Sequence, residues 1–262
     1  MTFTDRVAIV TGASSGIGLT MALELAKRGS KVGLLARRED ELRSLRDRIR
    51  TAGGTADYAV ADISDRSATL AAIASLRSAL GPVDLLIANA GVGSTNVRAD
   101  LKMTEADRVI RTNLLGVMYS IEAVLPEMLE RKTGTIAGIS SLASYKGLPG
   151  AAAYCASKAG LSAYLESLRI LYRSSGVKFS TVCPGFIATP MTSRNKGMFL
   201  VIPPDVAARR MIDAIARGKK VYNFPWLTYR LMRLTYWLPD WMLAGTVSEE
   251  VGGASDEQLG KK

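Results

Sequence analysis

Two side chains near the middle of the chain have types and a spacing that suit proton transfer. Tyr154 and Lys158 are four residues apart, so on a helix the phenol and the ammonium would lie on one face. A free tyrosine has a pKa of about 10, and one close opposite charge lowers such a pKa by roughly 1 to 3 units. The pair is therefore a candidate acid/base, and its alternative is a surface tyrosine beside a solvated lysine.

The composition limits which other groups can take part. The 262 residues include no histidine, and 34 Lys and Arg against 24 Asp and Glu give a formal net charge of +10. Acid/base chemistry must therefore come from Tyr, Lys, Asp, Glu or Cys, and the charge favours anionic partners. Cys155 and Cys183 are predicted to be free buried thiols, because their number and spacing fit neither a disulfide framework nor a zinc site; no metal is expected.

The hydrophobic pattern alternates between strand-like and helix-like segments. Short apolar, β-branched runs are separated by stretches with helical spacing, which is typical of a parallel sheet covered on both faces. We predict an α/β fold, a doubly wound parallel sheet of the Rossmann type with helices on both faces, in a single domain spanning residues 1–247. The predicted strands lie at 6–10, 31–36, 56–63, 83–91, 134–140 and 177–185, and the predicted helices include 39–52 and 105–131.

The amino terminus and the residues after position 185 allow further predictions. The amino terminus enters the first strand without a charged leader and apolar signal core, so we expect a cytoplasmic protein. Residues 186–204 are predicted to form a mobile loop over the carboxyl ends of the strands, where ligands bind in such sheets. Residues 205–245 are predicted to form an aromatic, basic helical segment, and residues 248–262 a flexible tail.

The aromatic, basic segment contains a stripe of leucines at helical spacing. The stripe lies between Pro225 and Pro239 and consists of Leu227, Leu231, Leu234 and Leu238. Three interpretations stay open. The stripe packs against another subunit or the chain's own core, covers a lipophilic pocket, or lies on an anionic membrane surface, which would give peripheral membrane contact through residues 225–245.

A glycine-rich turn, "TGASSGIG", stands between the first strand and the first helix. Gly12, Gly16 and Gly18 let the backbone approach a phosphate, and the helix end directs N–H groups toward it, which predicts a dinucleotide cofactor. After the second strand, Arg37 and Arg38 stand where NAD-binding sheets carry an acidic residue. Arginine suits a 2′-phosphate, so we predict NADP(H) in preference to NAD(H). The alternative is that both arginines only pair with the acidic residues at 39–40.

Further short motifs follow in order: "ANAG" at 88–91, "NLLG" at 113–116, "ISS" at 139–141, "YCASK" at 154–158 and "PGFIAT" at 184–189. Together with the glycine turn they resemble the short-chain dehydrogenase/reductase family over roughly residues 5 to 190. The resemblance implies hydride transfer between nicotinamide C4 and a carbonyl or secondary alcohol. It also implies a homo-dimer or homo-tetramer.

The resemblance assigns roles to residues by position. Tyr154 takes the place of the catalytic acid/base and Lys158 that of its partner. Ser141 takes the place of the catalytic serine, with Ser140 as its nearest competitor, and Asn113 that of the asparagine supporting the proton relay. Ser141 and Tyr154 would contact substrate. The positions expected to bind cofactor are Gly12, Ser14, Ser15, Gly16, Ile17, Gly18, Arg37, Arg38, Asp62, Ile63, Asn89, Ala90, Gly91, Tyr154, Lys158, Pro184, Gly185, Ile187 and Thr189.

The substrate is less constrained than the reaction. Met191, Met198 and Phe199 in the predicted loop favour a hydrophobic ketone, aldehyde or secondary alcohol. One alternative is a reductase of a 3-oxoacyl group on an acidic carrier protein, and another is a catalytically silent cofactor-binding regulator. No recognised nucleic-acid motif accompanies the basic charge, so no nucleic-acid partner is expected.

Overall fold

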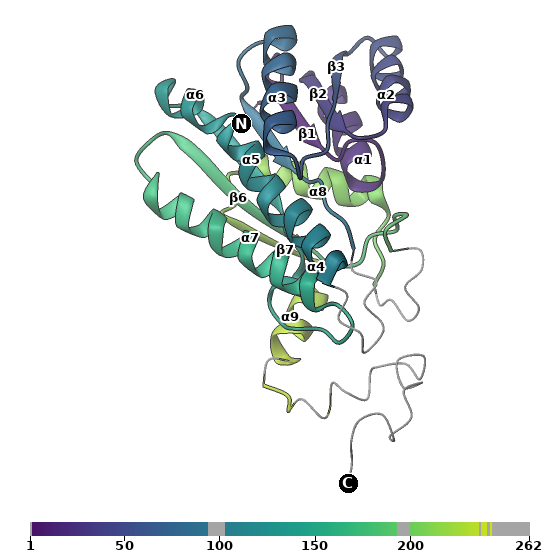
Figure 1. The fold of residues 1–262 in the computed structure, drawn as a ribbon, viewed down its shortest axis with the longest axis vertical. Coiled ribbons are helices and arrows are strands. Elements are labelled where there is room, and N and C mark those ends of the chain that lie inside the picture. The colour runs from purple at the N-terminus through teal and green to yellow at the C-terminus, as the bar shows by residue number, and fades with distance from the viewer. Residues whose placement is uncertain (1, 94–102, 193–199, 236, 240–241, 243–262) are drawn as a thin grey trace.

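The computed structural model describes residues 2–93, 103–192, 200–235, 237–239 and 242. In this part of the chain, seven parallel strands form one sheet in the order β3-β2-β1-β4-β5-β6-β7 (Figure 1). The predicted α/β fold with a Rossmann-type parallel sheet is confirmed. The strands are β1 Val7–Thr11, β2 Lys31–Ala36, β3 Thr55–Val60, β4 Leu85–Ala88, β5 Gly134–Ile139, β6 Val177–Pro184 and β7 Val221–Phe224.

Helices cover both faces of the sheet. Neighbouring strand residues point to opposite faces, so Ile9 and Val10 of β1 belong to two different apolar clusters. One face is covered by α1 (Gly16–Lys27), α2 (Glu39–Thr51) and α8 (Pro204–Ala216), and the other by α3 (Arg66–Leu80), α5 (Gly116–Glu122) and α7 (Ala152–Leu171). Burial on both sides explains why the inner strands β1 and β4 are apolar runs.

The prediction of one continuous helix over 105–131 is wrong. The structure has α4 (Met103–Ile110), a π-helical turn at Arg111–Leu115, α5, and then α6 (Leu125–Glu130). Proline lacks an N–H donor and suits the first turn of a helix, and Pro126 stands in the first turn of α6. The π-helical turn carries Asn113, whose side chain is fully buried.

The segment over 205–245 is also not helical throughout. It contains most of α8, the short strand β7 and α9 (Trp226–Thr235). β7 pairs in parallel with the end of β6, so a four-residue edge strand interrupts the expected helix. In the predicted loop at 186–204, Ile187 and Ile202 form an isolated parallel bridge and Pro204 already begins α8. Met198, Phe199 and the tail at 248–262 lie outside the described residues.

Both cysteines are free and buried, as predicted. Cys155 follows Tyr154 on α7, and Cys183 lies near the end of β6. Burial raises the pKa of the Cys183 thiol, and hydrogen bonds with neighbouring hydroxyl groups only partly offset this.

Candidate active site

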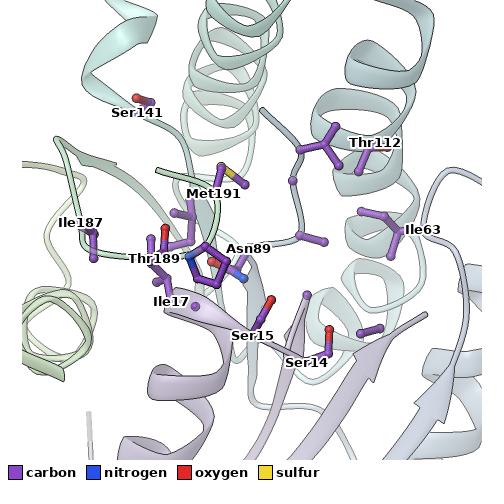
Figure 2. A pocket seen from close by; sticks show the side chains of 18 of the residues that line it. Ser14, Ser15, Ile17, Ile63, Asn89, Thr112, Ser141, Ile187, Thr189 and Met191 are labelled. Atoms are coloured by element: carbon purple, nitrogen blue, oxygen red, sulfur yellow. The ribbon is translucent and has the colours of Figure 1, made fainter. Parts of the chain in front are cut away.

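A cavity of about 310 Å³ lies where the strands β1 to β6 end. Its walls are the segments that follow those strands, and Figure 2 shows Ser14 and Ser15 toward one end and Ser141 toward the other. Gly18 and Asn113 are the predicted site residues that do not line it. Those that do are Gly12, Ser14, Ser15, Gly16, Ile17, Arg37, Arg38, Asp62, Ile63, Asn89, Ala90, Gly91, Ser141, Tyr154, Lys158, Pro184, Gly185, Ile187 and Thr189.

The glycine turn is shaped by backbone conformations that favour glycine. Gly12 has φ +68° and Gly16 has φ +56°. A Cβ on Gly12 would lie 2.7 Å from Cα of Ala90, so a side chain has no room there. Gly16 begins α1, whose first turn contains no acidic residue. The turn therefore offers free backbone N–H groups and the positive end of a helix to an anion.

Thr11 fixes this turn against the neighbouring strand, although sequence analysis did not single it out. Its buried Oγ1 accepts hydrogen bonds from the backbone N–H groups of Asn89 and Ala90, each at 3.0 Å. The Asn89 side chain donates in return to the Thr11 carbonyl at 3.0 Å. Gly18 completes the packing, because a Cβ there would overlap the carbonyl oxygen of Gly12.

Arg37 and Arg38 line the end of the cavity nearest β2 and β3. Arg38 donates to Oγ of Ser14, with Nη2 at 2.9 Å, and Arg37 pairs with Asp62 at 3.4 Å. Neither arginine pairs with Glu39 or Asp40, which pair with Arg43 farther along α2, but Arg38 pairs with Glu41 at 3.2 Å. Both cavity arginines remain exposed enough to contact a ligand.

Asp62 sits at the end of the cavity with its carboxylate held by local donors. Oδ1 accepts from the backbone N–H of Ser64 at 3.0 Å and from its hydroxyl at 2.8 Å. Burial acts to raise the pKa of Asp62, but these hydrogen bonds and the charge of Arg37 outweigh it, so the pKa lies below its usual value. The group is therefore ionised at neutral pH and can accept a hydrogen bond.

The two adjacent serines after β5 have different environments. Ser141 lies within hydrogen-bonding reach of the Tyr154 phenol, and its Oγ accepts from the Ala143 N–H at 3.1 Å. Ser140 is buried, and its hydroxyl donates to the Lys158 carbonyl at 3.0 Å and shares a 2.8 Å hydrogen bond with Ser162. Ser141 is thus placed for chemistry, whereas Ser140 ties β5 to α7.

Tyr154 and Lys158 both lie on α7, but their pKa shifts differ from the simple expectation. Lys158 is buried, its Nζ donates to the Ile139 carbonyl at 2.8 Å, and burial lowers its pKa to about 8. Burial raises the pKa of Tyr154, and the hydrogen bond with Ser141 only partly opposes this. The expected lowering by the ammonium is not seen. Nζ lies 5.8 Å from the centre of the phenol ring and is bonded elsewhere.

Asn113 does not reach the cavity but supports its wall. Its Oδ1 accepts from the Val92 N–H at 2.7 Å, and its Nδ2 donates to the Val92 carbonyl at 3.0 Å and to Oγ of Ser157 at 3.1 Å. Ser157 in turn donates to the Tyr154 carbonyl at 2.7 Å. The amide therefore joins the segment after β4 to the helix that carries Tyr154 and Lys158.

The remaining wall is a turn after β6 that sequence analysis recognised only in part. The Thr192 hydroxyl donates to the Ile187 carbonyl at 2.6 Å, and the Thr189 N–H donates to the Thr192 hydroxyl at 3.1 Å. Figure 2 shows Thr189 and Met191 on this turn beside the cavity. Thr112 and Val92 also line the cavity and were not predicted.

Known proteins are similar to this chain in sequence and in structure. A family model described as short chain dehydrogenase matches residues 6–199. An uncharacterized oxidoreductase of Myxococcus xanthus is 41% identical over 236 residues, covering 90% of this chain and 93% of the relative. The ketoacyl reductase HetN of Nostoc sp. is 35% identical over 192 residues, covering 73% and 67%. A variant of actinorhodin polyketide ketoreductase with NADPH has a TM-score of 0.77 and 31% identity, covering 86% of this chain and 97% of that chain.

Proposed function

Because the chain belongs to the short-chain dehydrogenase/reductase family, whose members are NAD(P)-binding oxidoreductases, we propose that it reduces the carbonyl of a lipophilic small molecule with NADPH, or oxidises the matching alcohol. One observation carries the proposal. One cavity is lined by the glycine turn, Arg37, Arg38, Ser141 and Tyr154. Ser14 of the turn, which bonds Arg38, lies toward one end, and Ser141, which bonds Tyr154, lies toward the other (Figure 2).

The residues at the first end fit a dinucleotide phosphate. Gly12 and Gly16 have no side chains, so backbone N–H groups are accessible where α1 begins. Arg37 and Arg38, which follow β2, line the same cavity and carry positive charge. These groups would hold the pyrophosphate and a 2′-phosphate. When bound, the nicotinamide supplies or accepts the hydride.

The residues at the other end handle the proton. In the reductive direction the carbonyl oxygen gains negative charge, and the Tyr154 phenol donates to it a hydrogen bond and then the proton. The raised pKa of Tyr154 keeps the phenol protonated at neutral pH, which suits this donor role. Ser141 donates a second hydrogen bond that orients the substrate. The Lys158 ammonium, close to Gly91, would hold ribose hydroxyls.

The test of the proton step is Tyr154→Phe, with NADPH oxidation measured across a panel of ketones and aldehydes. We expect turnover to fall by about 10² to 10⁴-fold while NADPH affinity is retained, because the substitution removes only the transferable proton. Tyr172→Phe, on a half-buried ring that stacks on Phe179, is the matched control. Turnover at the wild-type level in the Tyr154 variant would disprove the role.

The cofactor preference is tested separately by comparing Michaelis constants for NADPH and NADH. We expect the wild type to prefer NADPH and Arg38→Gln to lose about 10 to 100-fold in that preference, since charge-assisted hydrogen bonds contribute about 1.5 to 3 kcal/mol each. Arg43→Gln, on a side chain paired with Glu39 and outside the cavity, is the control. A wild-type preference for NADH would contradict the assignment of both arginines.

A second candidate substrate is a 3-oxoacyl group on an acidic carrier protein. The net charge of +10 suits such a carrier, and the relatives include ketoacyl and polyketide ketoreductases. Comparing one 3-oxoacyl chain as the free ketone, the coenzyme A thioester and the carrier-bound thioester decides the matter, because only a carrier-linked enzyme gains rate from the carrier. A homo-dimer or homo-tetramer and a cytoplasmic location are further parts of the proposal.

A further inference from the structure

Helix α9 exposes its apolar residues instead of burying them. None of its ten residues is buried, and the side chains of Leu227, Leu231 and Leu234 are all exposed. Trp226 at its start is 65% exposed, and Trp237 just beyond its end is 85% exposed. Three members of the predicted leucine stripe thus face away from the protein, so packing against the chain's own core does not explain them.

The face that α9 turns toward the protein does not contain the leucines. Its half-buried residues are Thr228, Tyr229, Met232 and Thr235, and Oγ1 of Thr228 is buried without a hydrogen-bond partner. A surface helix normally places its apolar stripe inward and its polar residues outward. In α9 the leucines instead lie on the outer side, together with both arginines of the helix. An exposed apolar stripe of this kind indicates an interaction surface on the outer side of α9.

Several contacts fix α9 to the end of the sheet beside the cavity. The rings of Tyr145 and Tyr229 meet edge to face with centroids 5.5 Å apart, and the Tyr145 hydroxyl donates to Asn223 of β7 at 3.1 Å. The Phe224 carbonyl, just before α9, accepts from the N–H of the cavity residue Gly185 at 2.7 Å. Figure 1 shows α9 at the lower end of the molecule, apart from the helices that cover the sheet.

The charge on the outer face favours one occupant. Arg230 and Arg233 are exposed beside the leucines, with the Arg230 guanidinium 5.6 Å from the centre of the Trp226 ring. The sequence contains no Asp or Glu between residues 214 and 239. A two-fold contact between two copies through this face would bring the same arginines together, and α9 itself contains no Asp or Glu to pair with them. An anionic surface accommodates both the arginines and the leucines.

We propose that α9 docks this protein on the surface of an anionic lipid bilayer. The leucines enter the acyl boundary, the tryptophans lie at the headgroup level, and the two arginines face the lipid phosphates. The helix lies on the membrane, since no helix among the described residues is both long and apolar enough to cross one. Docking would also bring the open edge of the cavity near the bilayer, where a lipophilic substrate concentrates; this consequence alone rests on the proposed function.

Flotation of the full-length protein with lipid vesicles tests the docking independently of activity. We expect binding to vesicles of phosphatidylglycerol and phosphatidylcholine in equal parts, weakening as salt is raised, and much less binding to pure phosphatidylcholine. Each arginine near an anionic surface contributes about fivefold in affinity, so Arg230→Gln with Arg233→Gln should lower it by about 25-fold. Leu231→Asp should abolish it.

Val221→Asp is the matched control for Leu231→Asp. The two side chains are 41% and 44% exposed, and Val221 lies at the opposite end of β7 from α9. The control should float like the wild type, and all variants should keep NADPH affinity. Wild-type protein that fails to float, or equal losses in the two aspartate variants, would overturn the proposal. So would a change of oligomeric state in Leu231→Asp without vesicle binding by the wild type, which would identify a subunit contact.

Discussion

Replacing the buried lysine of the site should stabilise the protein at neutral pH while removing its activity. Lys158 is 4% exposed on α7, and burial lowers its pKa from 10.5 to about 8. Folding at pH 7 therefore buries a lysine that is still mostly protonated in a site that disfavours its charged form. Lys158→Met keeps an unbranched side chain of similar length and removes the charge.

The magnitude follows from the pKa shift and from the hydrogen bond that is lost. A shift from 10.5 to about 8 corresponds to about 3 kcal/mol of destabilisation when the lysine is charged in both states. The substitution also removes the bond from Nζ to the Ile139 carbonyl, which costs about 1 kcal/mol. The variant should therefore be more stable than the wild type by about 2 kcal/mol at pH 7.

The pH dependence has a definite sign. Between about pH 8 and 10.5 the unfolded chain retains the Lys158 proton and the folded protein releases it, so the wild type gains stability as pH rises. The advantage of Lys158→Met should accordingly vanish near pH 10. Urea denaturation without added cofactor at both pH values measures this, with Lys178→Met at an exposed strand position as control. A Lys158→Met variant that is less stable than the wild type at pH 7 would refute the reasoning. So would a difference in unfolding free energy that does not change with pH.

Three further outcomes are expected. Gly12→Ala should abolish NADPH binding and destabilise the fold, because the new Cβ would lie 2.7 Å from a backbone atom. Gly53→Ala, at a residue with φ +82° and open space around it, should lower the free energy of unfolding by only about 1 kcal/mol, as measured by thermal denaturation. Ser141→Ala should lower turnover with little loss of stability, and Ser140→Ala should do the reverse, as paired kinetics and melting curves would show. Thr11→Val should lower stability by about 2 kcal/mol by leaving two backbone N–H groups without their acceptor, and unchanged melting would contradict that role.

The parts of the fold that sequence predicted are those with a local signal. Strands β1, β2, β4 and β5 are almost entirely buried, so their apolar runs are visible without any knowledge of neighbours. β7 has four residues, of which Phe224 alone is buried, and it exists because it pairs with the end of β6. The formation of β7 therefore depends mostly on tertiary contacts and not on its own sequence. The break at Pro126 had a local signal that the helical pattern around it obscured.

The same distinction holds within the site. Glycines, arginines and serines next to strand ends could be placed on the cavity because parallel strands end at one edge. Thr11 and Thr192 were missed because their hydroxyl groups act through contacts with residues that only folding brings near. The side-chain contacts of Asn113 hold the wall of the cavity, and its support of a proton relay stays a prediction.

The pKa values of Tyr154 and Lys158 could not be predicted from their spacing on the helix alone. Helical spacing predicted that the ammonium would lower the pKa of the phenol, but Lys158 is buried and Tyr154 is half-buried, and desolvation opposes the charged form of each. The phenol therefore keeps its proton and the lysine holds its proton less firmly than usual. A protonated phenol beside Ser141 is a ready donor to a carbonyl oxygen, whereas the reverse reaction must first create a phenolate. With Tyr154 in its proposed role as the acid/base, we therefore expect reduction to be faster near neutral pH and oxidation to gain as pH rises.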